Sequence, residues 1–376
     1  MKLSIHHACP IPDSYRAARV SSLFNVEGDA DFRLDLDAPL SERDWQVGLV
    51  VGPSGTGKSS ILRSLFGARA AKGQRPWPKD QPLIDALGVQ SPFDDVTAAL
   101  AAVGLGTVPA WLRPYHVLST GEKFRADLAR LLIERPEPAV IDEFTSTVDR
   151  RVAQIAANAF AKSWRRSGPG QFVAASCHYD IVDWLQPDWV IDTRTATFDW
   201  RRLRRAPAIA MDIHQTDGSY WPLFEPHHYL KLPRMVAPAY YVGTVDGAPI
   251  AHICFSTRPG MKEARACRLV IMPEWQGAGL GLRFLNEVCA LWRRGINRHN
   301  KPMPTLFHTS HPGLAASLRR SPQWCQVSCA LFGGNKRRSA ASIERAAIRN
   351  GWASPTGGTS GFGGHMRAVQ GFRYVE

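Results

Sequence analysis

The stretch GPSGTGKS at residues 52–59 follows the apolar run QVGLVV (46–51) and precedes SSILRSLF (59–66). The run before it is typical of a buried strand, and the segment after it has the apolar spacing of a helix. The glycines of the stretch allow backbone N–H groups to point into a concave loop, and a helix beginning there adds the positive end of its dipole. The sequence therefore predicts a strand, a phosphate-binding loop and a helix, the opening unit of an α/β fold.

The same stretch fits G-x-x-x-x-G-K-[ST], the pattern of the P-loop that binds nucleoside triphosphates. Lys58 would neutralise the terminal phosphates, and the hydroxyl of Ser59 would bind Mg²⁺. The residues expected to contact ATP in this loop and at the start of its helix are Gly52, Ser54, Gly55, Thr56, Gly57, Lys58, Ser59 and Ser60.

A second sequence element, which is acidic, supports this interpretation. Residues 138–143 read PAVIDE, an apolar strand that ends in two carboxylates. Adjacent carboxylates are costly unless a cation lies nearby, and a nucleotide-bound Mg²⁺ supplies one. We expect Asp142 to hold the metal through water and Glu143 to polarise the attacking water.

Four further segments stand in the order found in ABC-type ATPases, which residues 1–200 resemble. Residues 118–122 (LSTGE) resemble the signature, 146–149 (STVD) the D-loop, His178 the switch histidine and Gln90 the Q-loop glutamine. The resemblance implies an ATP-dependent homodimer. In it, Ser119 and Gly121 of one protomer would contact ATP held by the other.

The resemblance also assigns roles to single residues. It implies that Asp149 and Gln90 contribute to the ATP site, that His178 acts in catalysis beside Glu143, and that Gln90 joins Ser59 and Asp142 around the metal. Two departures are visible. Thr120 and Glu122 replace the Gly and Gln of the signature. Only 29 positions separate Gln90 from Ser119, fewer than transporter cassettes use for their helical subdomain. With no membrane domain in the sequence either, a stand-alone ATPase is favoured over a transporter subunit.

The second half contains a different phosphate-binding pattern. The strand ACRLVIM (266–272) precedes the turn 276–281 and the amphipathic helix 282–292, and a hairpin with Asp246-Gly247 as its turn lies upstream. This order resembles motif A of GNAT acyltransferases, which implies that the turn binds the pyrophosphate of acetyl-CoA or another acyl-CoA. The positions carried over are Ile271, Gln276, Gly277, Ala278, Gly279, Leu280 and Gly281. A dinucleotide site would need an acidic residue about 20 positions further on, and none is evident.

The acyl-transfer chemistry is less well marked. GNAT enzymes often use a Tyr to protonate the leaving thiolate, and residues 307–320 contain none. His308 and His311 are the nearest groups suited to proton transfer. The alternative is structural, with His308 at a strand end and His311 at a helix start. A zinc site formed with Cys325 and Cys329 is a further alternative.

The charge of the chain is uneven. Of 46 Lys+Arg and 33 Asp+Glu, residues 1–200 hold 22 and 24, so the net charge of +13 divides into −2 and +15. A basic half predicts an acidic partner, most simply nucleic acid, although a solubilising surface is the alternative. Nearby aromatics such as Trp292, Trp324 and Phe332 could stack on bases. Trp292 and Trp324 could equally be core residues, which is the interpretation preferred for Trp292. Residues 308–312, 320–324 and 372–375 loosely resemble phage-associated GNAT-like domains of the Mom type, which modify DNA bases.

These observations give one architecture for the 376 residues. An ABC-type ATPase domain (1–200) is expected to precede a GNAT-like α/β domain with a mixed, largely antiparallel sheet (208–376), with a basic linker at 193–207. No apolar run is long enough to span a membrane, no secretory signal is visible and the seven cysteines are scattered, so a cytoplasmic protein is expected. The predicted function is ATP-dependent acyl transfer to an amine of nucleic acid. The alternatives are a nucleic-acid-binding ATPase with a non-catalytic GNAT-like module, or a protein N-acetyltransferase.

Overall fold

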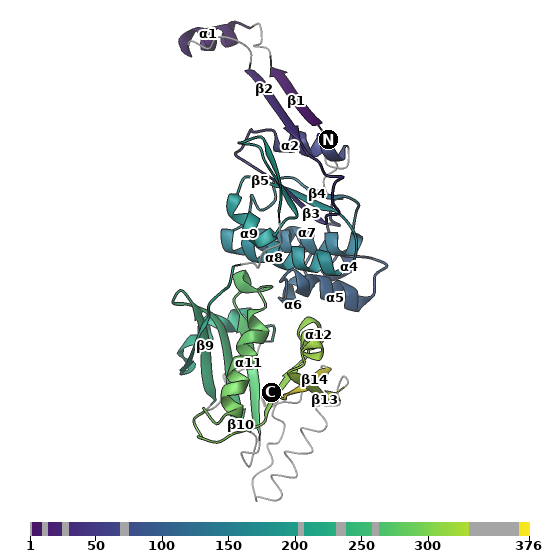
Figure 1. Ribbon diagram of the computed structural model, residues 1–376. Helices are drawn as coiled ribbons and strands as arrows, with labels where there is room; N and C mark the ends of the chain where they lie inside the picture. The colour runs from purple at the N-terminus through teal and green to yellow at the C-terminus, as the bar shows by residue number, and fades with distance from the viewer. Residues whose placement is uncertain are drawn as a thin grey trace, which may run out of the picture. The chain divides into compact units, whose positions relative to one another are not determined.

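The computed structural model describes residues 2–9, 14–24, 30–67, 75–201, 207–230, 238–257, 263–330 and 368–376 (Figure 1). The chain forms two compact units. The first unit comprises Met1–Trp77 and Glu134–Pro207, and the second comprises Pro78–Ile133 and Ala208–Glu376.

The first unit is built on a five-stranded sheet in the order β4-β5-β3-β6-β7. Strands β4 (Ala139–Ile141), β5 (Phe172–Ser176), β3 (Val47–Val51) and β6 (Trp189–Asp192) are parallel, and β7 (Thr197–Trp200) is antiparallel to β6. All residues of β3 and β5 are buried. This burial explains why both strands are continuous apolar runs, as parallel strands covered on both faces require.

Helices cover both faces of this sheet. Helix α2 (Lys58–Phe66) packs Ile61 and Leu62 into a cluster with Val50 and Val173. On the other face, α8 (Arg150–Arg166) places Phe160 with its ring centroid 4.7 Å from that of Phe172. The short elements η2 (Tyr179–Ile181) and α9 (Val182–Leu185) complete the unit, together with a ribbon of β1 (Lys2–Cys9) and β2 (Ala30–Asp37) joined through α1 (Tyr15–Phe24).

The second unit contains a seven-stranded sheet in the order β13-β14-β12-β11-β10-β9-β8. Its neighbours are antiparallel except for β11 and β12. The strand bounds are β8 Asp212–Thr216, β9 Ala239–Val245, β10 Ala248–Thr257, β11 Ala264–Ile271, β12 Thr305–Thr309, β13 Trp324–Ala330 and β14 Val369–Tyr374. The hairpin predicted at Asp246-Gly247 is present, and both residues have positive φ (51° and 78°), as its tight turn requires.

Helix α11 (Leu280–Arg293) covers one face of this sheet, with Trp292 stacked on Phe255 at 5.2 Å between ring centroids. Residues Trp221 and Phe224 of α10 (Trp221–Phe224) pack with Val270 of β11. Helix α12 (Pro312–Arg320) begins just after β12. The remaining short elements of this half are η3 Gly218–Tyr220, η4 Glu225–His227 and η5 Pro273–Trp275.

The helical segment of the second unit comes from the middle of the chain and packs against α12. Its elements are α4 Leu83–Ala86, α5 Phe93–Ala102, α6 Val108–Trp111, η1 Tyr115–Val117 and α7 Thr120–Glu134. Ala101 of α5 lies so close to Gly313 of α12 that a Cβ at Gly313 would come within 2.4 Å of its side chain. Residues Pro78–Ile133, which the sequence analysis places with residues 1–200, therefore belong to the same compact unit as the C-terminal half.

One expectation is corrected, and burial decides between the two alternatives for Trp292 and Trp324. The linker predicted at 193–207 cannot begin at 193, because Thr197–Trp200 is the edge strand β7, paired antiparallel with β6; residues 202–206 lie outside the described residues. Trp292 and Trp324 are buried, and their indole N–H groups bond Tyr241 and Asn286, so neither presents a face for stacking on bases. Phe332, the basic run 336–338 and the glycine-rich stretch 351–364 lie outside the described ranges. Among the described helices, none has the length and apolar character that a membrane crossing needs.

Candidate functional site

The loop 52–57 and the start of α2 form a cradle in the first unit. Gly57 stands at the N-cap of α2 with φ 82°, and no side chain caps the helix. The first N–H groups of a helix have no partner within it, so they can receive an anion. The ammonium group of Lys58 donates to the carbonyls of Gly52 (2.9 Å) and Pro53 (2.6 Å), which holds it at this loop.

Two glycines show which side of the loop is packed and which side is open. A Cβ at Gly52 would come within 1.9 Å of the Thr193 hydroxyl oxygen, while a Cβ at Gly55 would meet nothing within 4 Å. Thr56 donates its hydroxyl proton to the carbonyl of Pro53 at 2.8 Å, which ties the loop to itself. The loop is thus packed on its strand side and open at Gly55. The shape and the Lys58 charge fit the phosphates of a nucleotide.

The N-terminal ribbon reaches this loop, and sequence reasoning missed it. A Cβ at Gly57 would lie 2.7 Å from the ring of Phe32 on β2. His7 of β1 stacks on Phe32 with 6.3 Å between centroids and bonds the Ser60 hydroxyl through Nε2 at 2.8 Å. Ser60, predicted to contact ATP, is therefore engaged with His7. Strand periodicity in 2–9 and 30–37 was the available signal, and only the fold shows that it leads to the P-loop.

The two predicted carboxylates follow β4. Asp142 accepts a hydrogen bond through Oδ1 from the backbone N–H of Glu143 at 2.9 Å, and Glu143 has a left-handed backbone with φ 52°. Ser146 donates its hydroxyl to the carbonyl of Glu143 at 2.5 Å. Such conformations persist only when surrounding bonds hold them, and they concentrate at functional sites. Neither carboxylate forms an ion pair with a side chain in the described structure, which suits a metal-binding and water-polarising pair.

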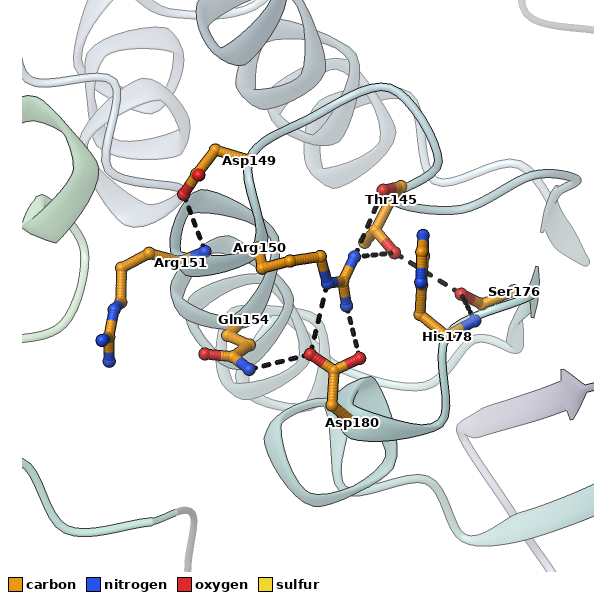
Figure 2. A network of polar contacts seen from close by, with 8 residues as sticks. All are labelled: Thr145, Asp149, Arg150, Arg151, Gln154, Ser176, His178 and Asp180. Carbon is orange, nitrogen blue, oxygen red and sulfur yellow. Dashed lines mark hydrogen bonds and ion pairs between the residues drawn. The ribbon is translucent and has the colours of Figure 1, made fainter.

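Figure 2 shows a polar network that joins the D-loop to the segment of the switch histidine. Arg150 holds Asp180 with two hydrogen bonds, from Nε to Oδ2 (3.2 Å) and from Nη2 to Oδ1 (2.5 Å). Gln154 adds a third bond to Asp180 at 2.8 Å. Asp149 accepts from the N–H of Arg151 at 2.8 Å and so caps α8. The D-loop aspartate is thus a helix cap in this structure.

His178 lies at the other end of that network. Its backbone N–H donates to the Ser176 hydroxyl at 3.1 Å, and Arg150 also bonds the carbonyl of Thr145 at 3.4 Å. Partial burial, and then the positive charge of Arg150, lower the pKa of His178 below 6.5, while Asp180 raises it. The ring therefore favours its neutral form at pH 7, in which it can accept one hydrogen bond and donate another.

The signature residues lie in the second unit, at the start of α7. Ser119 accepts from the N–H of Glu122 at 3.3 Å, and Glu122 accepts from the N–H of Ser119 at 2.9 Å. This reciprocal pair is a capping box, in which the Glu at the position of the signature Gln can take part. Ser119 keeps its hydroxyl proton for a further acceptor. Gly121 lies in the first turn of α7, and Gln90 is exposed in a turn of the same unit.

The predicted acyl-CoA turn lies between η5 and α11. Gly277 has φ 95°, and Gly279 is the N-cap of α11 with φ 78° and no side-chain cap. A Cβ at Gly279 would meet nothing within 4 Å, whereas one at Gly281 would lie 3.2 Å from the Ile271 side chain. This turn thus shares with the P-loop a left-handed glycine at an uncapped helix start, but Gly279 borders open space whereas Gly57 lies against Phe32. It fits a phosphate group.

Strands β11 and β12 separate next to this turn. They are paired only from Ala264 with Thr305 to Ala266 with Phe307, although β11 continues to Ile271 and β12 to Thr309. Arg268 has φ 57°, opposite a register shift between His252 and Cys254 of β10. A bulge of this kind bends a strand and disrupts its ladder locally, and here the carbonyl of Arg268 bonds Nδ1 of His252 at 3.3 Å. On the side of β12, no strand pairing is present beyond Ala266, and the carbonyl of Ile271 accepts from the Gln276 side chain at 3.1 Å.

The two predicted proton-transfer histidines have different surroundings. His311 is the N-cap of α12, accepting from Leu314 N–H through Nδ1 (3.2 Å) and donating from Nε2 to the carbonyl of Gly106 (3.0 Å). Both ring nitrogens are therefore in use, and burial lowers its pKa. His308 lies on β12 opposite Gly371 of β14. Tyr229, which sequence reasoning missed because it lies in an irregular segment, has its ring centroid 6.2 Å from the ring centroid of His311.

The zinc alternative finds no support. Among the described residues, which include His308, His311, Cys325 and Cys329, no group of three or more His, Cys, Asp or Glu side chains could hold a metal ion. Both cysteines are exposed thiols on β13.

Comparison with known proteins gives sequence relatives for part of the chain. No family model matches the chain. The nickel import ATP-binding protein NikO of Rhodobacter capsulatus is 28% identical over 193 residues, 40% of this chain and 74% of that protein. The zinc import ATP-binding protein ZnuC of Jannaschia is 32% identical over 129 residues, 30% of this chain. The chain spans 53% of that second relative.

Two solved structures align with part of this chain at low identity. The cbiO1 protein of Clostridium perfringens, part of an ABC transporter complex, aligns with 41% of this chain and 75% of its own at 19% identity and a TM-score of 0.32. The ribosomal-protein-S18-alanine N-acetyltransferase of Escherichia coli aligns with 44% and 93% at 12% identity and a TM-score of 0.29. From the sequence relatives and the ordered motifs, the chain contains an ABC-type ATPase domain over about 40% of its length.

Proposed function

We propose that this protein is an ATP-dependent acyltransferase that acts on nucleic acid. The ABC-type ATPase domain would bind and hydrolyse MgATP in a homodimer, and the GNAT-like part would transfer an acyl group from acyl-CoA to an amine. The observation that carries the proposal is the presence of two glycine cradles at uncapped helix starts, at Gly57 and at Gly279, each following a strand.

The acyl-CoA half of the proposal is supported by the parting of β11 from β12. An acyl-CoA laid along residues 269–271 could pair its amide-containing arm with the backbone edge of β11, while its pyrophosphate meets the N–H groups at Gly279 and Leu280. The residues that would hold it are those predicted from the turn. Gln276 has a supporting place, because its side-chain amide donates to the carbonyl of Ile271 at 3.1 Å.

Acyl-CoA supplies a thioester, and the chain must manage two protons. As the amine attacks the thioester carbonyl carbon, the new C–N bond forms and the C–S bond breaks, the amine loses a proton and the thiolate gains one. We assign the proton donor to Tyr229, a phenol beside His311, because α12 carries no tyrosine. His308 is the candidate base, since both nitrogens of His311 are engaged.

The acceptor is assigned from charge. Residues 201–376 carry the whole net positive charge, more than the phosphates of one acyl-CoA require. An exocyclic amine of a base is stacked inside a duplex, so a transferase needs that strand opened or the base flipped. An ATP-driven dimer that closes around the polymer would give a physical reason for joining the two activities in one chain.

Two binding measurements test the proposal on the full chain. Calorimetry with acetyl-CoA should show binding that Gly279→Val removes, because a branched side chain at φ 78° is strained and fills the turn, while Gly247→Val in the distant hairpin leaves it intact. Binding to a DNA or RNA oligonucleotide should weaken by about 10³-fold or more between 50 and 200 mM salt if six or more phosphates are contacted. Absence of acetyl-CoA binding, or nucleic-acid binding that salt leaves unchanged, contradicts the proposal.

A second function is favoured by one observation. His311 uses both ring nitrogens as a helix cap and a backbone anchor, as a purely structural residue would. The chain would then be a nucleic-acid-binding ATPase whose GNAT-like part only binds. Protein that binds nucleic acid and hydrolyses ATP, yet has no affinity for acetyl-CoA, would support this second function. If acetyl-CoA binds and labels protein lysines but no nucleic acid, the chain is instead a protein N-acetyltransferase.

A further inference from the structure

Arg125 of α7 is buried, with only 3% of its surface exposed, and no carboxylate bonds its guanidinium. Instead Nη1 donates to the carbonyls of Val103 (3.2 Å), Gly104 (2.6 Å) and Gln276 (2.6 Å), and Nη2 donates to that of Pro273 (3.1 Å). Two of these carbonyls belong to the helical segment, one (Gln276) to the predicted acyl-CoA turn and one (Pro273) to η5 directly before it. A single charged group thus holds both in place.

A second set of contacts lies beside the first. The N–H of Gly106 donates to Oε1 of Gln276 at 3.2 Å, and the carbonyl of Gly106 accepts from His311 at 3.0 Å. Trp111 places its ring edge on His311, with 5.5 Å between centroids. The space is tight, since a Cβ at Gly104 would lie 2.2 Å from the carbonyl oxygen of Gln276. The loop 104–106 therefore fits directly against the turn and the start of α12.

The signature and the acyl-CoA turn share one helix as support. Ser119 caps α7, and Arg125 lies six residues further along the same helix, about 9 Å along its axis. Through Arg125, the helix that carries the signature residues is hydrogen-bonded to the carbonyls of Pro273 and Gln276. Those carbonyls border the N–H groups that the pyrophosphate would use.

We propose that Arg125 is a positioning residue that couples ATP engagement at the signature to acyl-CoA binding at the turn 276–281. When Ser119 and Gly121 engage the partner's ATP, α7 is fixed and holds the turn in its binding shape. The inference rests on the proposed function, because it requires acyl-CoA at that turn. A turn that is already ordered loses less conformational freedom on binding, so ATP tightens acyl-CoA binding, and acyl-CoA tightens ATP binding by the same factor.

The test measures acetyl-CoA affinity of the full chain by calorimetry, with and without Mg²⁺ and a non-hydrolysable ATP analogue. We expect about tenfold tighter binding with the analogue, within the range of about 5–150-fold usual for coupled sites. Arg125→Lys keeps the charge but cannot reach the carbonyls on both sides, so the ratio should fall to within about twofold of one. The matched control is Arg130→Lys. Arg130 is a buried arginine of the same helix whose charge acts on the pKa of Tyr115, so this variant should leave the affinity ratio unchanged.

A milder variant keeps the test decisive if Arg125→Lys unfolds. Gly106→Val disturbs the contact between the loop 104–106 and Gln276 without removing a buried charge. The effect of the analogue on acetyl-CoA affinity should also disappear in this variant. In the unaltered chain, the analogue should slow hydrogen exchange of the amides at 277–281. An unchanged affinity and exchange rate with the analogue, or an equal ratio in both variants and the unaltered chain, overturns the coupling while acyl-CoA binding stands. Failure to bind acetyl-CoA under any condition overturns the proposed acyltransferase itself.

Discussion

Arg125 donates a 2.6 Å hydrogen bond from Nη1 to the carbonyl oxygen of Gln276, 151 positions further along the chain. Burial lowers the pKa of Arg125 to about 10, so its guanidinium group stays charged at neutral pH. A buried charge without its partners is costly. The bond therefore marks a permanent contact between the signature helix and the predicted acyl-CoA turn, which belong to one compact unit.

Lys58→Ala should abolish ATP binding. Its ammonium group is held by the carbonyls of Gly52 and Pro53, at the place where the phosphates would lie. Equilibrium binding of a fluorescent ATP analogue measures the loss, and circular dichroism should show an unchanged fold. Lys162→Ala, which removes an exposed lysine of α8, is the control and should bind normally. Normal binding by Lys58→Ala would contradict the assignment of the P-loop.

Glu143→Gln should slow ATP hydrolysis by about 10²-fold or more, because the amide cannot take a proton from the attacking water. ATP binding should persist, so the variant should accumulate as an ATP-bound dimer that is visible by light scattering. Phosphate release measures the rate. Glu137→Gln, a change in the loop before β4, is the matched control and should hydrolyse ATP at the normal rate.

The pair Arg150 and Asp180 should tune His178 in opposite directions. Arg150 lowers the pKa of His178 and Asp180 raises it. Arg150→Met should therefore raise the pKa of His178 back towards 6.5, and Asp180→Asn should lower it further, while burial acts in both variants. Titration of the His178 ring by NMR measures both. Shifts of the same sign in the two variants would show that the network of Figure 2 does not act on His178 through charge.

His252 should make the second unit less stable in acid. Its ring is fully buried against Trp221, Phe224 and Tyr240, and burial lowers its pKa to about 4. The folded form then binds a proton less readily than the unfolded form. Stability is therefore complete above pH 6.5 and is lost as the pH falls from there towards 4, by about 3 kcal/mol in all.

Hydrogen exchange of the β9 and β10 amides in urea, compared between pH 7.5 and 5, measures this effect. His252→Phe should reduce the pH dependence, because the ring that would have to be protonated is gone. His214→Phe, on the exposed surface of β8, should leave it in place. An equal pH dependence in the unaltered chain and in His252→Phe would show that other groups cause it.

Much of the local structure could be predicted from the sequence. The helix after Lys58, the strand Ala139–Ile141 and the Asp246-Gly247 hairpin have strong local signals, since apolar periodicity, strand length and turn residues agree there. Both glycine cradles were predicted for the same reason. Each needs only a glycine where φ is positive and a helix that begins after it.

The long-range contacts could not be predicted. Nothing local to Arg125 indicates that its partners are Pro273 and Gln276, and nothing near Tyr229 indicates that it lies beside His311. The packing of Pro78–Ile133 with the C-terminal half also depends on contacts between distant segments. The sequence does not distinguish 197–200 from the linker, because β7 is a short edge strand with two exposed positions, and such strands carry a weak periodic signal.

The most direct test of the central claim is an acyl-transfer assay with the purified full chain. The protein is incubated with MgATP, labelled acetyl-CoA and single- or double-stranded nucleic acid, and the polymer is then digested to nucleosides for mass spectrometry. The account predicts an acylated nucleoside that requires ATP and is absent with Lys58→Ala and with Gly279→Val. Unmodified nucleosides from protein that binds both ATP and acetyl-CoA would contradict it.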